Sequence, residues 1–494
     1  HFRRNSFGLS HYSYLYASHT LLYQTEKQLE SHQTMNENII LQQFQQQKNF
    51  FDSNKTKPID SRIKALERFR NTILKYESQI IEALHQDLGK SDFESYTTEI
   101  NIVLEEIALH IKKLKKWAKP QKKGSPLVIF PSKSYIYNEP YGVVLIIGTW
   151  NYPFHLLFNP LVCALSAGNC AILKTAPYAP NTSEILEKII CESFATDYVT
   201  LFHGNREVTQ NLLTLPFDLI FYTGNPTVGK VVMEAAAQHL TPVILELGGK
   251  SPCIVDKDAD IKLAAKRIAW GKTINCGQTC IAPDYLFIHN DVKYEFAKEF
   301  KKAITEMFGE DIKKSPDYPR LISVKATHRL AGFLKSGIIL VGGDHDIYGR
   351  FIEPTLLCNV PENAYIMQEE IFGPILPMIE FSEIKTVIQY IKEHEKPLAL
   401  YYFTKDKGKA EKVLNETSSG GACINDTLLH ITNPNLPFGG VGNSGMGAYH
   451  GKFGFDAMSH RKAVVKSTFL FDLKIKYPPY KGKLNLFKKL LNKK

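Results

Sequence analysis

Between residues 143 and 247 the sequence alternates short apolar runs with longer segments of helical pattern. The five runs are VVLII, AILK, VTLF, DLIFY and VILEL, and they are rich in Val, Ile and Leu. Runs that are apolar on both faces are typical of strands buried between layers of helices, so the alternation predicts a parallel, doubly wound sheet. Such sheets bind ligands at the carboxyl ends of their strands, which makes the residues after each run the first candidates for a functional site.

A second alternating stretch spans residues 251–426. Its strands are indicated by PCIV, YLFI, IILVG and ALYYF, with helical patterns between them, and it predicts a second α/β domain. Residues 126–140 and 457–471 instead have extended character, and we expect these two segments to pair with each other.

Two helices are predicted upstream of the first sheet. Apolar residues recur at three- and four-residue steps over residues 60–88, which predicts one amphipathic helix that is capped by Asp60 or Ser61 and ended by Gly89. A similar pattern over residues 98–117 predicts a second helix.

The chain has 494 residues and a formal net charge of +10, and such a charge could indicate a nucleic-acid partner. Its distribution argues against one. Residues 473–494 hold eight lysines and no acid, residues 1–34 contribute +1, and the remainder carries only +1. The main body is therefore nearly neutral, and we expect no nucleic-acid binding.

The eight cysteines are spread through the chain without a close-set framework. Disulfides are therefore not expected, and a reducing compartment such as the cytoplasm is favoured. Cys276 and Cys280 form a Cys-x-x-x-Cys pair, but a structural zinc site needs two further ligands at a recognisable spacing and none lies nearby, so we expect no metal. Cys276 is either a thiol that forms a reversible disulfide with Cys280 or a bystander.

The two ends of the chain are predicted to be appendages. Residues 1–34 match a secretory signal poorly and precede Met35, which has the character of a natural start, so we interpret them as an extension that need not be native. No window approaches the roughly 18 uninterrupted apolar residues of a membrane-spanning helix. Residues 473–494 are either a basic amphipathic tail that touches a membrane surface or a solvated tail. The apolar residues that can share one helix face of this tail are Leu484, Leu486, Phe487, Leu490 and Leu491.

Three side chains in short motifs suit catalysis. Cys280 lies in the loop NCGQTC, where a turn beside polar groups can lower the pKa of a thiol enough to make it a nucleophile; the alternative is a buried structural cysteine. Glu246 ends the run VILEL, where partial burial suits a general base, and a salt bridge or a cap is the alternative. Glu370 lies in EEIFGP, which taken alone can be a helix-ending turn.

Further candidates follow the strands of the first predicted sheet. Asn151, in WNYPF, can donate its amide to a developing oxyanion or can simply cap the next helix. Lys174 ends the second run, where a cation can reach a ribose or a phosphate. Gly224 and Gly229 frame a turn after the fourth run, which is a weak signal because the full G-x-G-x-x-G spacing is missing.

Together and in this order, these motifs are specific. WNYPF, LELGGKSP, GQTC, EEIFGP and LPFGGVGNSGMG strongly resemble the aldehyde dehydrogenase superfamily, and YHGKFGFDAMSHRK resembles its class 3 branch of fatty- and aromatic-aldehyde-oxidising members. The resemblance implies a Rossmann-like cofactor domain, an α/β catalytic domain and a bridging β oligomerisation element. The corresponding residues are 35–124 with 141–245, 246–426, and 125–140 with 455–472.

By this resemblance, Cys280 is the nucleophile that adds to an aldehyde carbon, from which a hydride passes to the nicotinamide of NAD. The side chain of Asn151 and the backbone N–H of Cys280 resemble the oxyanion hole of the family. Glu246 occupies the position of the general base, with Glu370 as the other candidate. The implied cofactor site consists of Thr149, Trp150, Lys174, Gly224, Gly229, Glu370 and Phe372.

The chain departs from the family after Lys174, where Thr175-Ala176-Pro177 replaces the usual Pro-Ser-Glu. A carboxylate at this place would repel a 2′-phosphate. Its loss leads us to expect NAD as the main cofactor with appreciable use of NADP.

The family resemblance also bears on substrate, assembly and location. It implies medium- or long-chain aliphatic or aromatic aldehydes, with an apolar entrance formed by Tyr152, Trp270 and Phe438. It implies a homodimer as well, in the cytoplasm or peripheral at a membrane surface. Two other functions stay open: a CoA-acylating aldehyde dehydrogenase, which usually lacks a base like Glu246, and a structural or ligand-binding role.

Overall fold

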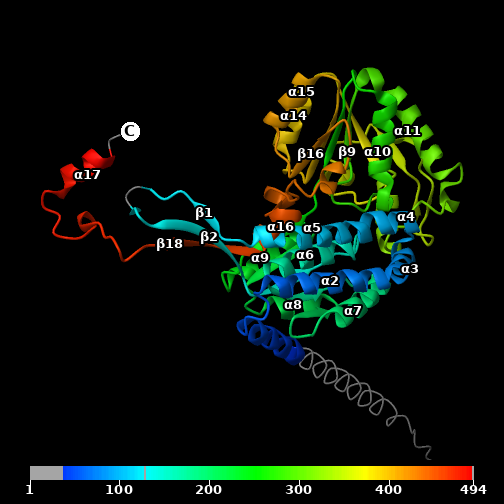
Figure 1. Cartoon of the computed structure of the whole chain (residues 1–494). Helices are drawn as coiled ribbons and strands as arrows, with labels where there is room; N and C mark the ends of the chain where they lie inside the picture. The colour runs from blue at the N-terminus through cyan, green and yellow to red at the C-terminus, as the bar shows by residue number, and fades with distance from the viewer. Residues whose placement is uncertain (1–36, 127–128, 492–494) are drawn as a thin grey trace, which may run out of the picture.

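The computed structural model describes residues 37–126 and 129–491, and for Leu490 and Leu491 it describes the backbone alone. Two α/β lobes lie one above the other in Figure 1, and a narrow β arm projects from them. The predicted N-terminal extension, residues 1–34, lies outside the described residues. Each lobe is built around one large sheet.

The sheet of the lower lobe has six strands in the order β17-β7-β6-β3-β4-β5. Five of them are the predicted apolar runs, and they are parallel: β3 (Val143–Ile147), β4 (Cys170–Lys174), β5 (Val199–Phe202), β6 (Leu219–Gly224) and β7 (Val243–Leu247). Every residue of β3 and β4 is buried. The sixth strand, β17 (Gly445–Met446), runs antiparallel to β7 and places Gly445 opposite Glu246. The predicted doubly wound sheet is confirmed, with one antiparallel strand added at its edge.

Helices enclose this sheet and shape its carboxyl edge. They are α2 (Ile59–Lys75), α3 (Glu77–Leu88), α4 (Asp92–Ser95), α5 (Asn101–Trp117), α6 (His155–Ala167), α7 (Pro180–Ser193), α8 (Arg206–Leu213) and α9 (Pro226–Ala237). A short π-helical turn, Tyr96–Ile100, precedes α5. All residues of α6 are buried, since this apolar helix packs on β3 and β4 and against α2 and α5.

The single helix predicted over residues 60–88 is in fact two helices. The chain leaves helical geometry at Tyr76, whose hydroxyl group donates to Glu192 at 2.6 Å. The first helix begins directly after Pro58, so the predicted cap at Asp60 or Ser61 is wrong. A tertiary hydrogen bond at one aromatic residue thus interrupts a continuous apolar pattern.

The upper lobe has a seven-stranded sheet in the order β10-β13-β14-β9-β8-β15-β16. The predicted strands are β8 (Pro252–Val255), β9 (Tyr285–His289), β10 (Ile338–Val341) and β15 (Ala399–Phe403). Three further strands were not predicted: β13 (Thr355–Cys358), β14 (Ile375–Phe381) and β16 (Gly421–Ile424). β14 contains Pro377 and β16 opens with Gly421, and both residue types weaken a strand pattern. The main helices of this lobe are α10 (Ile261–Thr273), α11 (Lys293–Phe308), α12 (Val324–Phe333), α14 (Ile384–Glu393) and α15 (Lys407–Glu416). The short helix α16 (Gly451–Ala457) instead packs on α5 and α6 of the lower lobe.

The arm is a three-stranded antiparallel sheet of β1 (Gln121–Lys123), β2 (Lys133–Pro140) and β18 (Ser459–Lys466). β18 pairs with β2 over its whole length, from Ser459 opposite Pro140 to Lys466 opposite Lys133. The expected pairing of the two extended segments is therefore confirmed. The arm carries the C-terminal segment away from both lobes in Figure 1.

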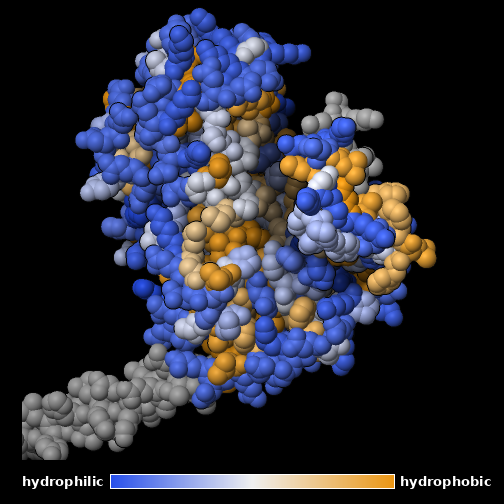
Figure 2. All heavy atoms as spheres, turned by 90° about the vertical axis from the view of Figure 1, so that its left-hand side faces the viewer, coloured by the Kyte–Doolittle hydropathy of each residue, from blue (hydrophilic) through white to orange (hydrophobic). Residues whose placement is uncertain are grey.

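Beyond the arm the chain ends in helix α17 (Lys483–Leu491). Phe469 and Leu470, which precede it, are almost fully exposed, and Leu484 and Leu486 on the helix are more than half exposed. Figure 2, which views the molecule from the side of the arm, shows apolar surface gathered on this tail. Among the described residues, no helix has the length and apolar character needed to cross a membrane.

Candidate active site

Two cavities meet between the lobes at the loop that carries Cys280. The first, of about 370 Å³, lies at the carboxyl ends of β3, β4, β6 and β7, and we call it the sheet cavity. The second, of about 560 Å³, is lined mainly by apolar side chains, and we call it the apolar cavity. Cys280 borders both. A molecule bonded to its sulfur can therefore extend into the apolar cavity while it faces the contents of the sheet cavity.

The sheet cavity gathers residues that are far apart in the sequence. Nine of the ten predicted site residues border it: Thr149, Trp150, Asn151, Lys174, Gly224, Glu246, Cys280, Glu370 and Phe372. The tenth, Gly229, does not. It is buried in α9, where a Cβ atom would come within 2.8 Å of the Leu247 side chain. Gly229 thus allows α9 to pack closely on β7, and the structure does not place it at a cofactor.

The loop before Cys280 is held in a strained conformation. Asn275 and Cys276 have φ angles of 51° and 55°, which cost energy in residues with a Cβ atom. The buried side chain of Gln278 secures the loop, because it donates to the Asn275 carbonyl at 3.0 Å and accepts from the Ile322 N–H at 2.8 Å. These bonds fix the position of Cys280, two residues further along the chain. The role of Gln278 was not found from the sequence.

The sulfur of Cys280 does not have the lowered pKa that its loop had led us to expect. Burial raises the pKa of this thiol, and the carboxyl groups of Glu370 and Glu246 raise it further. The backbone N–H groups of Cys280 and Ile281 oppose the increase, because they favour the thiolate. At neutral pH Cys280 is therefore a thiol, and it needs a base before it can act as a nucleophile.

All eight cysteines are free. The thiol of Cys276 is buried and donates to the hydroxyl group of Tyr318 at 3.5 Å. Burial raises its pKa to about 12. Cys276 is thus a protonated thiol engaged with Tyr318 and is not joined to Cys280.

Asn151 connects the two lobes at the reaction centre. It lies in the loop between β3 and α6, it is buried, and its side-chain nitrogen donates to the carbonyl oxygen of Gln278 at 3.0 Å. An amide nitrogen carries two hydrogens, so one remains for a ligand next to Cys280. The helix that follows begins only at His155, and Asn151 does not cap it. The geometry therefore favours the oxyanion role over the capping role.

Two carboxyl groups face the sheet cavity. Glu246, at the end of β7, is buried, and neither of its oxygens has a partner among the described residues. Burial raises its pKa well above the usual value. The pKa of Glu370 is raised to about 8, first by burial and then by the charge of Asp284. Any side chain at Gly248 would collide with the Glu370 carboxyl group, so this glycine makes room for it. Glu370 is therefore mostly protonated at neutral pH, and both carboxyl groups are placed to exchange protons with a molecule in the sheet cavity.

Lys174, Trp150 and Phe372 form another part of the sheet cavity. The ammonium group of Lys174 donates to the carbonyl oxygens of Thr175 and Gly204, at 2.6 and 2.7 Å, and burial lowers its pKa to about 8. The rings of Trp150 and Phe372 meet edge to face with centroids 5.4 Å apart. Phe372 has a φ of 53°, so the backbone is strained where its ring is placed.

The apolar cavity extends from Cys280 toward the surface. Tyr152, Trp270 and Phe438, the predicted entrance residues, all border it. The Tyr152 hydroxyl group shares a hydrogen bond of 2.7 Å with the side chain of Thr279, the residue before Cys280. The other apolar side chains of the wall include Phe93, Ile102, Leu156, Ile274, Met307, Phe308, Leu428, Leu429 and Ile431.

Comparison with known proteins now decides the family, because the sequence model of the "Aldehyde dehydrogenase family" matches residues 21–464. The chain belongs to the aldehyde dehydrogenase family. Its relatives include 4,4'-diaponeurosporen-aldehyde dehydrogenase of Staphylococcus aureus, which is 47% identical over 91% of this chain and 99% of that protein. The dimeric NADP-preferring aldehyde dehydrogenase of Canis lupus familiaris is 44% identical over 88% of this chain and 96% of that one.

A solved structure and a further sequence relative agree with this assignment. The substrate-bound state of Staphylococcus aureus AldH superimposes with a TM-score of 0.90 at 46% identity, covering 92% of this chain and 99% of that chain. A mouse relative named aldehyde dehydrogenase family 3 member A2 is 44% identical over 87% of this chain and 89% of that protein. The resemblance to the class 3 branch is thus confirmed, and so is the aldehyde dehydrogenase fold.

In this aldehyde dehydrogenase, the Asn151 loop rests on a buried ion pair that the sequence analysis missed. Lys90 Nζ lies 2.5 Å from Glu99 Oε1, and both side chains are fully buried. Lys90 also donates to the Asn151 carbonyl at 3.2 Å, while the second oxygen of Glu99 accepts from the N–H groups of Phe154 and His155. The pair holds both sides of the loop. The sequence shows one sign of this ion pair, because the charged residue Glu99 lies at a position of the helical pattern that faces the interior.

We predict that Lys90→Met both destabilises the protein and slows catalysis. Removal of one partner leaves a buried carboxylate unpaired, so the free energy of unfolding should fall by about 3–5 kcal/mol. Lys115→Met, at an exposed ion pair, should leave it within about 0.5 kcal/mol of wild type. Urea unfolding and the rate of NADH formation measure the two effects. A Lys90→Met protein with the wild-type unfolding midpoint and the wild-type kcat would show that the pair does not hold the loop.

Proposed function

We propose that this chain oxidises aldehydes to carboxylic acids with NAD(P)⁺ and that Cys280 is its nucleophile. The observation that carries the proposal is the position of Cys280 at the junction of the two cavities. An aldehyde whose chain lies in the apolar cavity brings its carbonyl carbon to the sulfur. The C–H bond of that carbon then faces the sheet cavity, where a hydride acceptor can lie.

The residues around Cys280 supply the other functions of the reaction. After a base takes the thiol proton, the sulfur bonds to the carbonyl carbon, and the oxygen that becomes negative is held by the Asn151 side-chain nitrogen and the Cys280 backbone N–H. The sheet cavity would hold NAD(P)⁺ as the hydride acceptor, and loss of a hydride from that carbon would leave a thioester on Cys280. Glu246 in its ionised form accepts a proton from the water that attacks the thioester, so that the acid leaves and the thiol is restored.

The sheet cavity fits a dinucleotide. The first turn of α9 faces it with Asn225 and Val228, and a helix N-terminus favours an anionic group such as a pyrophosphate. At Gly224 any side chain would collide with the Tyr222 ring, so the wall there is backbone. Thr175, Ala176 and Pro177 border the cavity without adding a carboxylate beside Lys174. These features support NAD as the main cofactor with appreciable use of NADP, and the canine relative is named NADP-preferring.

The apolar cavity supports medium- or long-chain aliphatic or aromatic aldehydes as substrates, because its wall offers apolar contact over most of its extent. The relative from Staphylococcus aureus is named for a 4,4'-diaponeurosporen-aldehyde. A CoA-acylating reaction finds no support among these relatives, which are named simply as aldehyde dehydrogenases. A base at Glu246 also favours water over a thiol as the group that releases the acyl chain.

We predict that the protein forms NADH from hexanal, decanal and benzaldehyde and that Cys280→Ala abolishes this activity. Cys276→Ala is the matched control and should retain activity, because the Cys276 thiol lies in the same loop but is hydrogen-bonded to Tyr318. Absorbance of NADH measures the rate, and the same assay with NADP⁺ measures cofactor preference. An NADP/NAD ratio of kcat/KM below about one in a thousand, about 4 kcal/mol, would contradict the cofactor proposal. Activity that survives in Cys280→Ala would refute the mechanism.

We predict that kcat rises with pH until Glu246 is fully ionised. Burial raises the pKa of Glu246, and this carboxyl group can act as a base only when it is ionised. Below that pKa, kcat should therefore fall by up to about tenfold for each unit by which the pH is lowered. Glu246→Gln should remove this dependence and lower kcat by about 100-fold or more. If Glu370→Gln instead removes it and Glu246→Gln does not, then Glu370, with its pKa of about 8, is the base.

The arm and tail support two further proposals. The arm exposes apolar side chains at Val465 and Phe130, which favours burial against a second copy and hence a homodimer. The tail combines exposed Leu484 and Leu486 with lysines, which supports peripheral contact of a cytoplasmic enzyme with an anionic membrane surface. The amphipathic helix α17 is the element that would lie in the membrane interface.

We predict that the full chain floats with vesicles that contain anionic lipid, whereas a chain that ends at Pro479 stays in the soluble fraction. A variant with Leu484→Ser and Leu486→Ser keeps every lysine and should float less, since it loses apolar burial alone. Equal flotation of the full and shortened chains would dispose of the membrane proposal.

A further inference from the structure

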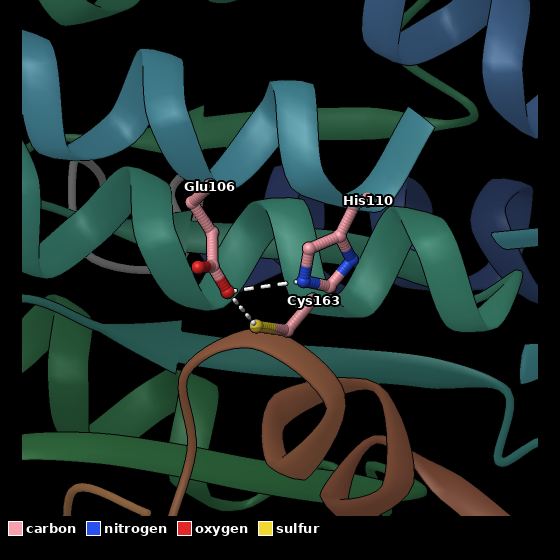
Figure 3. Close-up of side chains that lie close together, drawn as sticks. All are labelled: Glu106, His110 and Cys163. Atoms are coloured by element: carbon pink, nitrogen blue, oxygen red, sulfur yellow. Dashed lines mark hydrogen bonds and ion pairs between the residues drawn. The ribbon is translucent and has the colours of Figure 1, made fainter. Parts of the chain in front are cut away.

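A buried polar cluster joins the two helices α5 and α6 behind the reaction centre. Figure 3 shows Glu106 and His110 on α5 and Cys163 on α6 turned toward one another. Oxygen Oε1 of Glu106 lies 3.0 Å from His110 Nε2 and 3.6 Å from Cys163 Sγ. All three side chains are buried, in a region where α6 is otherwise largely apolar. Such a group requires a complete set of hydrogen bonds.

His110 bridges two groups of the cluster. Its Nδ1 lies 2.7 Å from the hydroxyl oxygen of Ser166, and its Nε2 donates to the Glu106 carboxylate. The Ser166 hydroxyl group also lies 2.9 Å from the carbonyl oxygen of Cys163. Glu106 is the carboxylate partner of His110, and Cys163 is a thiol that donates to the same oxygen.

The charge of Glu106 is maintained despite its burial. Burial alone would raise its pKa, but the charge and hydrogen bond of His110, with the backbone N–H of Gly451, lower it to about 2. The titratable groups around this carboxylate are His110 on its own helix, Cys163 and His155 on α6, and Tyr449 and His450 in the turn before α16. Glu106 is thus ionised at neutral pH.

The same carboxylate oxygen reaches a third element of the structure. It accepts from the backbone N–H of Gly451 at 2.7 Å, although the two residues are 345 positions apart in the chain. Gly451 and the residue before it, His450, have φ angles of 50° and 78°. His450 has a Cβ atom and therefore pays a cost for this conformation. At Gly451 any Cβ would collide with the carbonyl oxygen of Pro434. A hydrogen bond to a full charge is a suitable means of holding such a turn.

This turn carries Tyr449, which packs against the wall of the apolar cavity. The Tyr449 ring is fully buried and contacts Phe221 and Phe438, with centroids 5.0 and 5.9 Å away. Burial raises the pKa of Tyr449 strongly. Phe438 in turn borders the apolar cavity and exchanges two backbone hydrogen bonds with Tyr449.

We propose that the Glu106–His110 pair is a positioning unit of the active site, which holds the strained turn at residues 449–451 and so keeps Phe438, the backbone partner of Tyr449, in the wall of the apolar cavity. Neither Glu106 nor His110 borders the two cavities. Both therefore act through the turn and not on the substrate. The proposal rests on the proposed function of Cys280 and Glu246.

The test compares Glu106→Gln with Glu105→Gln, its exposed neighbour on the same helix. Gln has the shape of Glu but no charge, so we expect kcat for decanal to fall about tenfold or more while KM for NAD⁺ stays unchanged, and we expect Glu105→Gln to behave as wild type. His110→Gln can donate to Glu106 and accept from Ser166, so it should keep kcat within about threefold of wild type. His110→Leu should reproduce the loss of Glu106→Gln.

Three outcomes would overturn the proposal. Glu106→Gln with the wild-type kcat would show that the charge is not needed, and a lowered melting temperature with wild-type kcat in the folded enzyme would show a structural role alone. One equivalent of zinc in the purified enzyme, lost in Cys163→Ala, would show that a metal and not a proton holds the cluster. Loss of the proposed function is separate, because it is read from Cys280→Ala and not from these variants.

Discussion

The hydrogen bond from the Asn151 side chain to the Gln278 carbonyl, 3.0 Å long, is the contact on which the active site depends. It joins a loop of the lower sheet to the strained loop of the upper lobe that carries Cys280. Each loop is also secured within its own lobe, one by the Lys90–Glu99 pair and the other by the Gln278 side chain. A sulfur held in this way can border two cavities at once, which a reaction between two separately bound molecules requires.

The interior around this contact includes charged side chains that are removed from water. Lys90–Glu99 and Glu106–His110 are both buried pairs. Burial of ions costs several kcal/mol of folding free energy, and the attraction between the two partners offsets a cost of about that size. Their value is therefore in geometry more than in net stability. Each pair adds bonds to backbone N–H or carbonyl groups of a loop that apolar packing alone would leave free to shift: Asn151 in one case and Gly451 in the other.

The sequence was a good guide wherever a pattern is local. The runs that became β3, β4, β6 and β7 are apolar on both faces, and their carboxyl ends located six of the ten predicted site residues, namely Thr149, Trp150, Asn151, Lys174, Gly224 and Glu246. Prediction failed where tertiary contacts decide. Tyr76 breaks a continuous helical pattern through a bond to Glu192, and the pKa of Cys280 is raised by burial that no loop motif reveals. Glu106 and Gly451 could not have been paired by spacing, because they are brought together only by the complete fold.

We propose that Cys280 holds the substrate as a thioester that Glu246 helps water to cleave. The most direct measurement is mass spectrometry of the Glu246→Gln enzyme, mixed with NAD⁺ and decanal and then quenched in acid. We expect a burst of one NADH per active site and a decanoyl adduct on the peptide that contains Cys280. An unmodified Cys280, or an adduct on Cys276 in its place, would contradict it.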